Sequence, residues 1–117
     1  MTNILQILET APEQIRIAAE QVANDEMVVK ASKFALSVAI AKATIQNSEA
    51  KNQKLLEALV TQDAGVQIES LNLFKAEAEL KKSKIAMDYE ENKFVSARKI
   101  GGLDERVLQS ISASNIA

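Results

Sequence analysis

An apolar residue recurs at every seventh position through much of the second half of the chain. The repeat consists of Val66, Leu73, Leu80, Met87 and Phe94. A second apolar set, Leu71, Ala78 and Ile85, lies about 160° away around a helix of 3.6 residues per turn. A helix with two nearly opposite apolar faces needs a neighbour on each side, and a simple two-helix hairpin provides only one. We therefore expect this helix to pack on further helices of its own chain or of another copy.

The composition predicts an all-α protein. Hydrophobic residues make up 47% of the 117 residues, but aromatic residues only 3%, and the chain has three glycines and one proline. β-Sheet proteins need more turn residues and favour aromatic and β-branched side chains. The length suits one domain. We predict a single helical domain over residues 1–117, with a frayed tail at 112–117.

The residue types of the chain exclude several kinds of chemistry. Cysteine and histidine are absent, so disulfides, thiolate nucleophiles, Cys/His zinc sites and imidazole acid–base catalysis are excluded. The carboxylates include neither the Glu-x-x-His pairs of di-metal bundles nor a calcium-binding loop. We find no pairing of a nucleophile with a base, and we predict a non-enzymatic protein with no catalytic residue, metal or cofactor.

Features of the sequence also bear on its location. The N-terminus lacks the basic region of a signal peptide, and the longest apolar stretch, 34–45, contains Lys42 and is shorter than the ~20 residues that span a bilayer. We expect a cytoplasmic protein with no membrane partner. A cell-envelope or extracellular destination without a cleaved signal stays open.

Capping signals predict where the first two helices begin. Thr10, Pro12 and Glu13 suit a capping box, which places a first helix at about 11–23. Asn24 is either a second cap or part of a continuous, kinked helix, and a second helix then covers about 25–61. Between Met27 and Ile45 this helix is apolar almost all round. Its few polar side chains leave most of the circumference free for packing.

The best break in the centre of the chain is Gln62-Asp63-Ala64-Gly65. A third helix is predicted at about 66–99, ended by the pair Gly101-Gly102, with a short final helix over 103–111. Folding back at residue 64 places position i opposite about 128 − i, so that Phe34 would lie near Phe94. The predicted fold is a long antiparallel helical hairpin (25–61 and 66–99) with short flanking helices, as a coiled-coil-like or helix-bundle oligomer.

These patterns predict a protein that works by protein–protein contact, as an adaptor, an inhibitor or a structural subunit. The seven-residue repeat serves either as an intramolecular core or as a self-association surface. Because the first and last helices are too short to cover the remaining face, we expect a homo-oligomer, a dimer before a tetramer. Another protein as partner is the second possibility.

Basic residues indicate an alternative function in nucleic-acid binding. They are Lys81, Lys82, Lys84, Lys93, Arg98 and Lys99. Tyr89 lies between the two groups and offers one stacking surface for a base. Such a protein would be an accessory factor of replication or recombination, of the kind that phages and mobile elements encode. A solvated face balanced by nearby glutamates is the preferred interpretation, since the net charge is −2.

Overall fold

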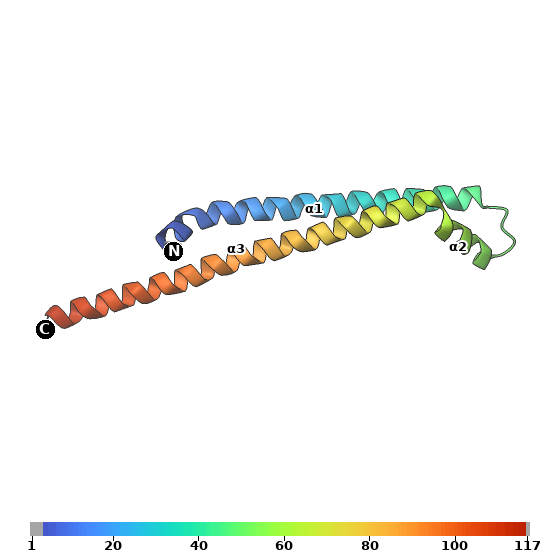
Figure 1. The fold of residues 1–117 in the computed structure, drawn as a ribbon. Coiled ribbons are helices and arrows are strands. Elements are labelled where there is room, and N and C mark those ends of the chain that lie inside the picture. Colours follow the sequence, from blue (N-terminus) through green and yellow to red (C-terminus); the bar gives the residue numbers. More distant parts are fainter. Residues whose placement is uncertain (1–3, 117) are drawn as a thin grey trace. The chain divides into compact units, whose positions relative to one another are not determined.

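The structure, a computed structural model, describes residues 4–116, with side chains described as far as Gly102. The described residues form three helices: α1 (Ile4–Gln46), α2 (Gln53–Gln62) and α3 (Ala64–Ile116). No strand occurs among them. Figure 1 shows α1 and α3 as the two arms of a hairpin, with α2 between them in the chain. The prediction of an all-α helical hairpin is confirmed.

The chain divides into two compact units, which we describe separately. The central unit is Val22–Ser83, and the terminal unit combines Met1–Gln21 with Lys84–Ala117. In the central unit, the second half of α1 packs antiparallel against the start of α3, and α2 lies beside α1. In the terminal unit, the first half of α1 accompanies the later part of α3.

The prediction that the first helix begins at residue 11 is wrong, because α1 starts at Ile4. The Thr10 hydroxyl donates to the Gln6 carbonyl, 2.8 Å away, as a residue inside a helix does. Pro12 also lies inside α1 and removes one amide donor there. Apolar side chains upstream of Thr10, including the half-buried Leu8, gain contacts when the helix continues through them. That packing outweighs the capping signal.

The alternative of one continuous helix through Asn24 is confirmed, whereas a separate second helix over 25–61 is wrong, because α1 ends at Gln46. The Asn47 side-chain amide donates to the Ala43 carbonyl at 2.8 Å and satisfies one of the last carbonyls of α1. Asn52 has an extended backbone and accepts from the Leu55 amide at 2.8 Å, which caps α2. Asparagine and serine favour such local bonds over a helix interior. Residues 47–52 are therefore a loop between α1 and α2.

The predicted break at 62–65 is a true helix boundary, but it joins α2 to α3 instead of joining the two arms. Asp63 is extended, and its Oδ2 accepts from the Val66 amide at 3.1 Å, so that it caps α3. At the other end, α3 continues through Gly101 and Gly102, neither of which has a positive φ. The predicted helix end at 99 and the separate helix at 103–111 are therefore wrong. The fraying of 112–117 stays a prediction, and Ala117 lies outside the described residues.

The register of the hairpin differs from the prediction. Ser83 donates a hydrogen bond to Asp25, which places position i of α1 opposite about 108 − i of α3 in the central unit. The expected rule was 128 − i, because it counted the loop and α2 as part of the first arm. Phe34 consequently lies at the level of Phe74, and Phe94 belongs to the other unit. The predicted Phe34–Phe94 contact is wrong.

Candidate self-association surface

The packing between α1 and α3 in the central unit follows a strict three–four spacing on both helices. We call this set of facing residues the inner seam. The register of 108 − i is shifted by one residue in alternate layers. Two layers pair large residues with large ones, Val29–Leu80 and Leu36–Leu73, and a third apolar layer pairs Ala43 with Val66. The small or polar layers between them are Asp25–Ser83, Ser32–Ala76 and Ala39–Glu69.

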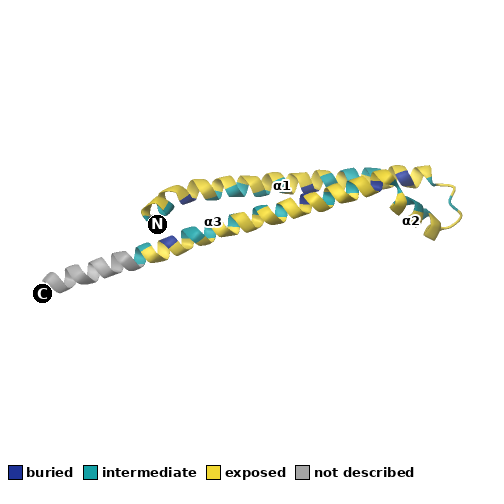
Figure 2. Cartoon of the chain, viewed as in Figure 1, coloured by how far each residue is buried: buried dark blue, intermediate teal, exposed yellow. Residues whose placement is uncertain are grey.

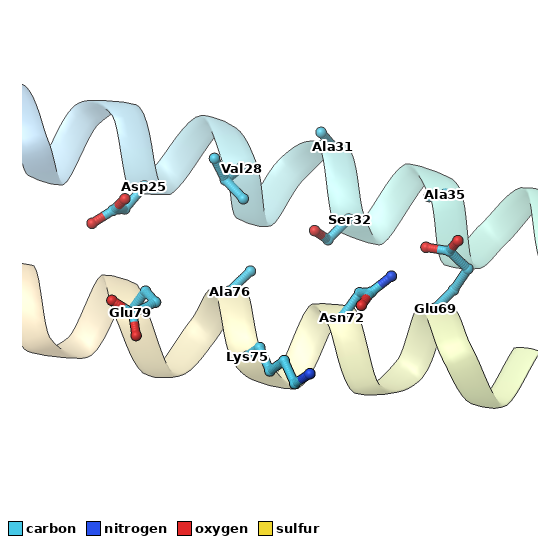
Figure 3. Close-up of a pocket in the computed structure, with 10 residues that line it drawn as sticks. All are labelled: Asp25, Val28, Ala31, Ser32, Ala35, Glu69, Asn72, Lys75, Ala76 and Glu79. Atoms are coloured by element: carbon cyan, nitrogen blue, oxygen red, sulfur yellow. The ribbon is translucent and has the colours of Figure 1, made fainter.

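Side chains of the small or polar layers point from each helix toward the other. In Figure 3, Ala76 of α3 points toward α1, whereas Ala31 of α1 points away from α3. Asp25 and Ser83 form the side-chain hydrogen bond between the helices. A polar pair at a seam position favours one register of a helix pair, because a slipped register breaks the hydrogen bond between the helices.

The terminal unit has a seam of the same kind. Ala11 and Ala97 are 1% and 3% exposed, respectively. Gly101 lies against Leu8, since a Cβ on this glycine would be 3.7 Å from Leu8 Cδ1. Glu90 occupies a half-buried seam position, and Lys93 Nζ lies 3.2 Å from its Oε2.

All five residues of the predicted seven-residue repeat lie on the seam side of α3. Val66 is buried, and Leu73, Leu80, Met87 and Phe94 are half-buried. Sequence reasoning missed the other half of the α3 seam, which lies three residues after each of them: Glu69, Ala76, Ser83, Glu90 and Ala97. A search for apolar residues alone skips this set. Its signal was the regular offset of three residues, at positions held by alanine, serine or glutamate.

The inner seam buries little. Among the described side chains, the buried ones are all alanine or valine: Ala11, Val29, Ala43, Val66, Ala76 and Ala97. Figure 2 shows exposed residues along both long helices. Large apolar side chains that stay exposed among the described residues include Phe34, Phe74 and Ile85. Much of the apolar surface in the described part of the chain is therefore uncovered.

A second regular apolar set follows α1 on the side opposite the inner seam. We call it the α1 stripe, and it consists of Met27, Ala31, Phe34, Val38, Ala41 and Ile45. Met27, Phe34 and Ile45 are 69%, 72% and 73% exposed. The spacing of four and three residues keeps the set on one face of the helix for three heptads. No charged residue interrupts it.

The outward face of α3 carries the second predicted apolar set in a weaker form. Leu71, Ala78 and Ile85 are exposed there, and Phe74 beside them is 71% exposed. The positions that would complete a stripe with the spacing of the α1 stripe hold lysines, Lys75 and Lys82. The expected burial of this face does not occur within the described part of the chain.

Helix α2 covers one edge of α1 and leaves the α1 stripe open. Leu56 and Val60 of α2 line a shallow groove with Ile40 and Thr44 of α1. Ile45, one residue farther along α1, stays exposed.

The six predicted phosphate-contact residues are divided between the two units. Lys81 and Lys82 belong to the central unit, and Lys84, Lys93, Arg98 and Lys99 to the terminal unit. Lys82 pairs with Glu79 at 3.3 Å. Lys93 pairs with Glu90 and lies 5.5 Å from the Tyr89 ring centre. The Arg98 guanidinium lies 5.8 Å from the Phe94 ring centre. Three of the six cations thus already have an intramolecular contact.

Other features of the described residues offer little chemistry. Arg16 hydrogen-bonds the Glu13 carboxylate and lowers the pKa of Glu13, while the pKa of Arg16 is raised. The carboxylates with described side chains form no cluster of three or more suited to a metal ion. None of the helices in the described part combines the length and hydropathy needed to cross a bilayer.

Comparison with known proteins adds no functional information: the chain matches no family model, no curated protein and no solved structure.

Proposed function

We propose that this protein is a non-enzymatic assembly subunit that self-associates and acts through protein–protein contact. The observation that carries the proposal is the α1 stripe, a regular apolar face that stays mostly exposed on a helix whose other face is already packed. Val38 is its one half-buried member, and it lines a groove with Phe34 and with Ile68 of α3. Exposed apolar surfaces of this regularity are uncommon on monomers and are typical of helix–helix interfaces.

The shallow inner seam supports the same proposal. Leu36, Leu73 and Leu80 lie in the seam but are only half-buried. A leucine gains its full ~1.5–3 kcal/mol only when it is completely withdrawn from water. Association through the α1 stripe would bury further apolar surface and add stability that the inner seam alone does not supply.

The test is the mass of the protein in solution, measured by light scattering across a micromolar concentration series. We expect a multiple of the 12.7 kDa chain mass and a thermal midpoint that rises with concentration, since association stabilises the folded state by mass action. A well-folded monomer with a cooperative transition independent of concentration would overturn the proposal.

The nucleic-acid function has weaker support, because three of its six residues already have intramolecular contacts with side chains of the same helix.

A further inference from the structure

The α1 stripe reads nearly the same from either end. Its order is large, small, large, large, small, large, from Met27 to Ile45. Turned end to end on a second copy, it matches itself when position i lies opposite 72 − i. The resulting layers are Met27–Ile45, Ala31–Ala41 and Phe34–Val38, each of them formed twice. We infer that two copies of this chain pair antiparallel through the α1 stripe in this register, an inference that rests on the proposed self-association.

The pattern suits a two-fold interface. A symmetric dimer needs one surface patch that is complementary to itself. In this register alanine meets alanine in two layers, so the two helices approach closely there. Large side chains meet large ones in the other four layers and fill the space between. The stripe covers about 27 Å of helix at 1.5 Å per residue, which is enough for several layers in succession.

The charges beside the stripe permit this pairing. The flanking positions are Val28, Ala35 and Lys42 on one side and Lys30, Ser37 and Thr44 on the other. In the antiparallel register Lys42 lies beside Val28 of the second copy, and Lys30 lies beside its Thr44. No lysine on these flanks faces another lysine. The like-charge contacts that reject wrong partners are therefore absent here.

The exposed area is adequate for a dimer. Met27, Phe34 and Ile45 are each about 70% exposed. With about 200 Å² for a fully exposed large side chain, they present roughly 400 Å² per copy, half of the ~800 Å² that each partner contributes to a standard interface. The other stripe residues and the aliphatic stems of Lys30 and Lys42 border the same face and add to this area.

The comparison with α3 selects α1 as the contact face. The corresponding outward positions of α3 include Lys75 and Lys82. Burying these lysines in a helix interface would require removing their charges from water. The α1 stripe carries no such cost.

Two phenylalanines provide a matched test. Phe34 in the α1 stripe is 72% exposed, and Phe74 on the outward face of α3 is 71% exposed. We would compare Phe34→Glu with Phe74→Glu by light scattering, with far-ultraviolet circular dichroism as the check on folding. We expect the unmodified protein at twice the 12.7 kDa chain mass. Phe34→Glu should raise the dimer dissociation constant by ~30-fold or more, the effect of losing an interface hot spot, and Phe74→Glu should leave the dimer intact.

Chemical cross-linking gives a measurement that does not depend on disrupting the interface. The chain has no cysteine, so a single introduced thiol reports one position. Ser37 lies beside the two-fold axis, where it faces Ser37 of the second copy. Ser37→Cys should form a covalent dimer with a short bis-maleimide reagent, and Ser70→Cys, at an exposed serine on α3, should stay monomeric on a denaturing gel.

The possible outcomes separate this inference from the proposed function. A dimer that Phe74→Glu dissociates and Phe34→Glu preserves would overturn the α1 pairing while self-association stands. Cross-linking through Ser70→Cys in place of Ser37→Cys would have the same meaning. A monomeric unmodified protein would overturn both proposals. Binding of such a monomer to vesicles containing phosphatidylserine, lost in Phe34→Glu, would show that lipid covers the stripe instead.

Discussion

The two faces of α1 in the central unit carry the same three–four spacing but have different surroundings. The inner seam, which includes Val29 and Ser32, is covered by α3, whereas the α1 stripe, which includes Phe34, is open. The stripe is the more apolar of the two, since the inner seam contains Asp25 and Ser32. The amount of apolar surface therefore does not decide which face packs within the chain.

What distinguishes the inner seam is a matching partner. The α3 helix repeats the alternation of large and small layers, and its polar Ser83 meets Asp25. Its outward face has lysines in the corresponding places and offers no such match to the α1 stripe. The inner seam and the α1 stripe thus differ in what they specify. A pattern that alternates apolar with polar layers specifies one register, whereas a uniformly apolar stripe provides a surface on which a second copy can pack. Four variants, each with an expected outcome, test this comparison.

The largest effect is expected from a charge in the inner seam. Leu80→Asp places a carboxylate among half-buried apolar side chains. The cost of an unpaired buried charge is several kcal/mol, comparable to the whole ~5–15 kcal/mol stability of a domain. We expect loss of most of the helical signal in circular dichroism. Ile85→Asp on the outward face, where the side chain is exposed, should retain it, and equal loss in both would show that the two faces of α3 are equally packed.

The second effect concerns the lysines that interrupt the outward face of α3. The double variant Lys75→Leu, Lys82→Leu would convert this face into a stripe like that of α1. Each leucine adds ~1.5–3 kcal/mol when fully buried, so we expect a larger assembly than the unmodified protein at equal micromolar concentration, measured by light scattering. The matched control is Lys75→Gln, Lys82→Gln. An unchanged mass for the leucine variant would mean that these lysines do not limit assembly.

A smaller effect is expected from the polar layer of the inner seam. Ser83→Ala removes the donor to Asp25 and should lower the free energy of unfolding by about 1 kcal/mol. Urea denaturation followed by circular dichroism measures it. Ser96→Ala, at an exposed position of the same helix, is the control and should change little. A more stable Ser83→Ala variant would indicate that the polar pair costs more in desolvation than it contributes.

The smallest effect on the fold is expected at the basic residues. Changing Lys81, Lys82 and Lys84 together to glutamate should preserve helicity and oligomeric mass, since all three side chains are exposed and surface changes usually alter stability by ~0.5 kcal/mol or less. Loss of the fold would show that the group is structural. Single-stranded DNA binding by the unmodified protein that falls steeply with salt, and disappears in this variant, would favour the nucleic-acid function.

Much of the secondary structure could be read from local patterns, but its boundaries depended on competition between signals. Thr10 and Pro12 formed a valid capping signal that lost to the packing of Leu8. Gly101 and Gly102 were a valid stop signal, yet α3 continues through them. Each of these local preferences amounts to about 1 kcal/mol, which a few seam contacts along a long helix can exceed. Asn47 and Asn52 make the local hydrogen bonds at the end of α1 and the start of α2, at positions where the sequence analysis expected a continuous helix.

The sequence by itself determined that the chain is helical and that its long helices have two apolar faces, because these properties follow from residue type and spacing along one helix. Only the tertiary structure decided the register of 108 − i and which face of α1 packs against α3. Both depend on which layers of α1 and α3 fit one another. They also depend on the loop after α1 and on the ten-residue helix α2, which do not belong to the first arm of the hairpin. The candidate interface could be identified only from the structure, which shows that α3 packs on the inner seam of α1. An apolar face is available to a second copy only where its own chain leaves that face uncovered.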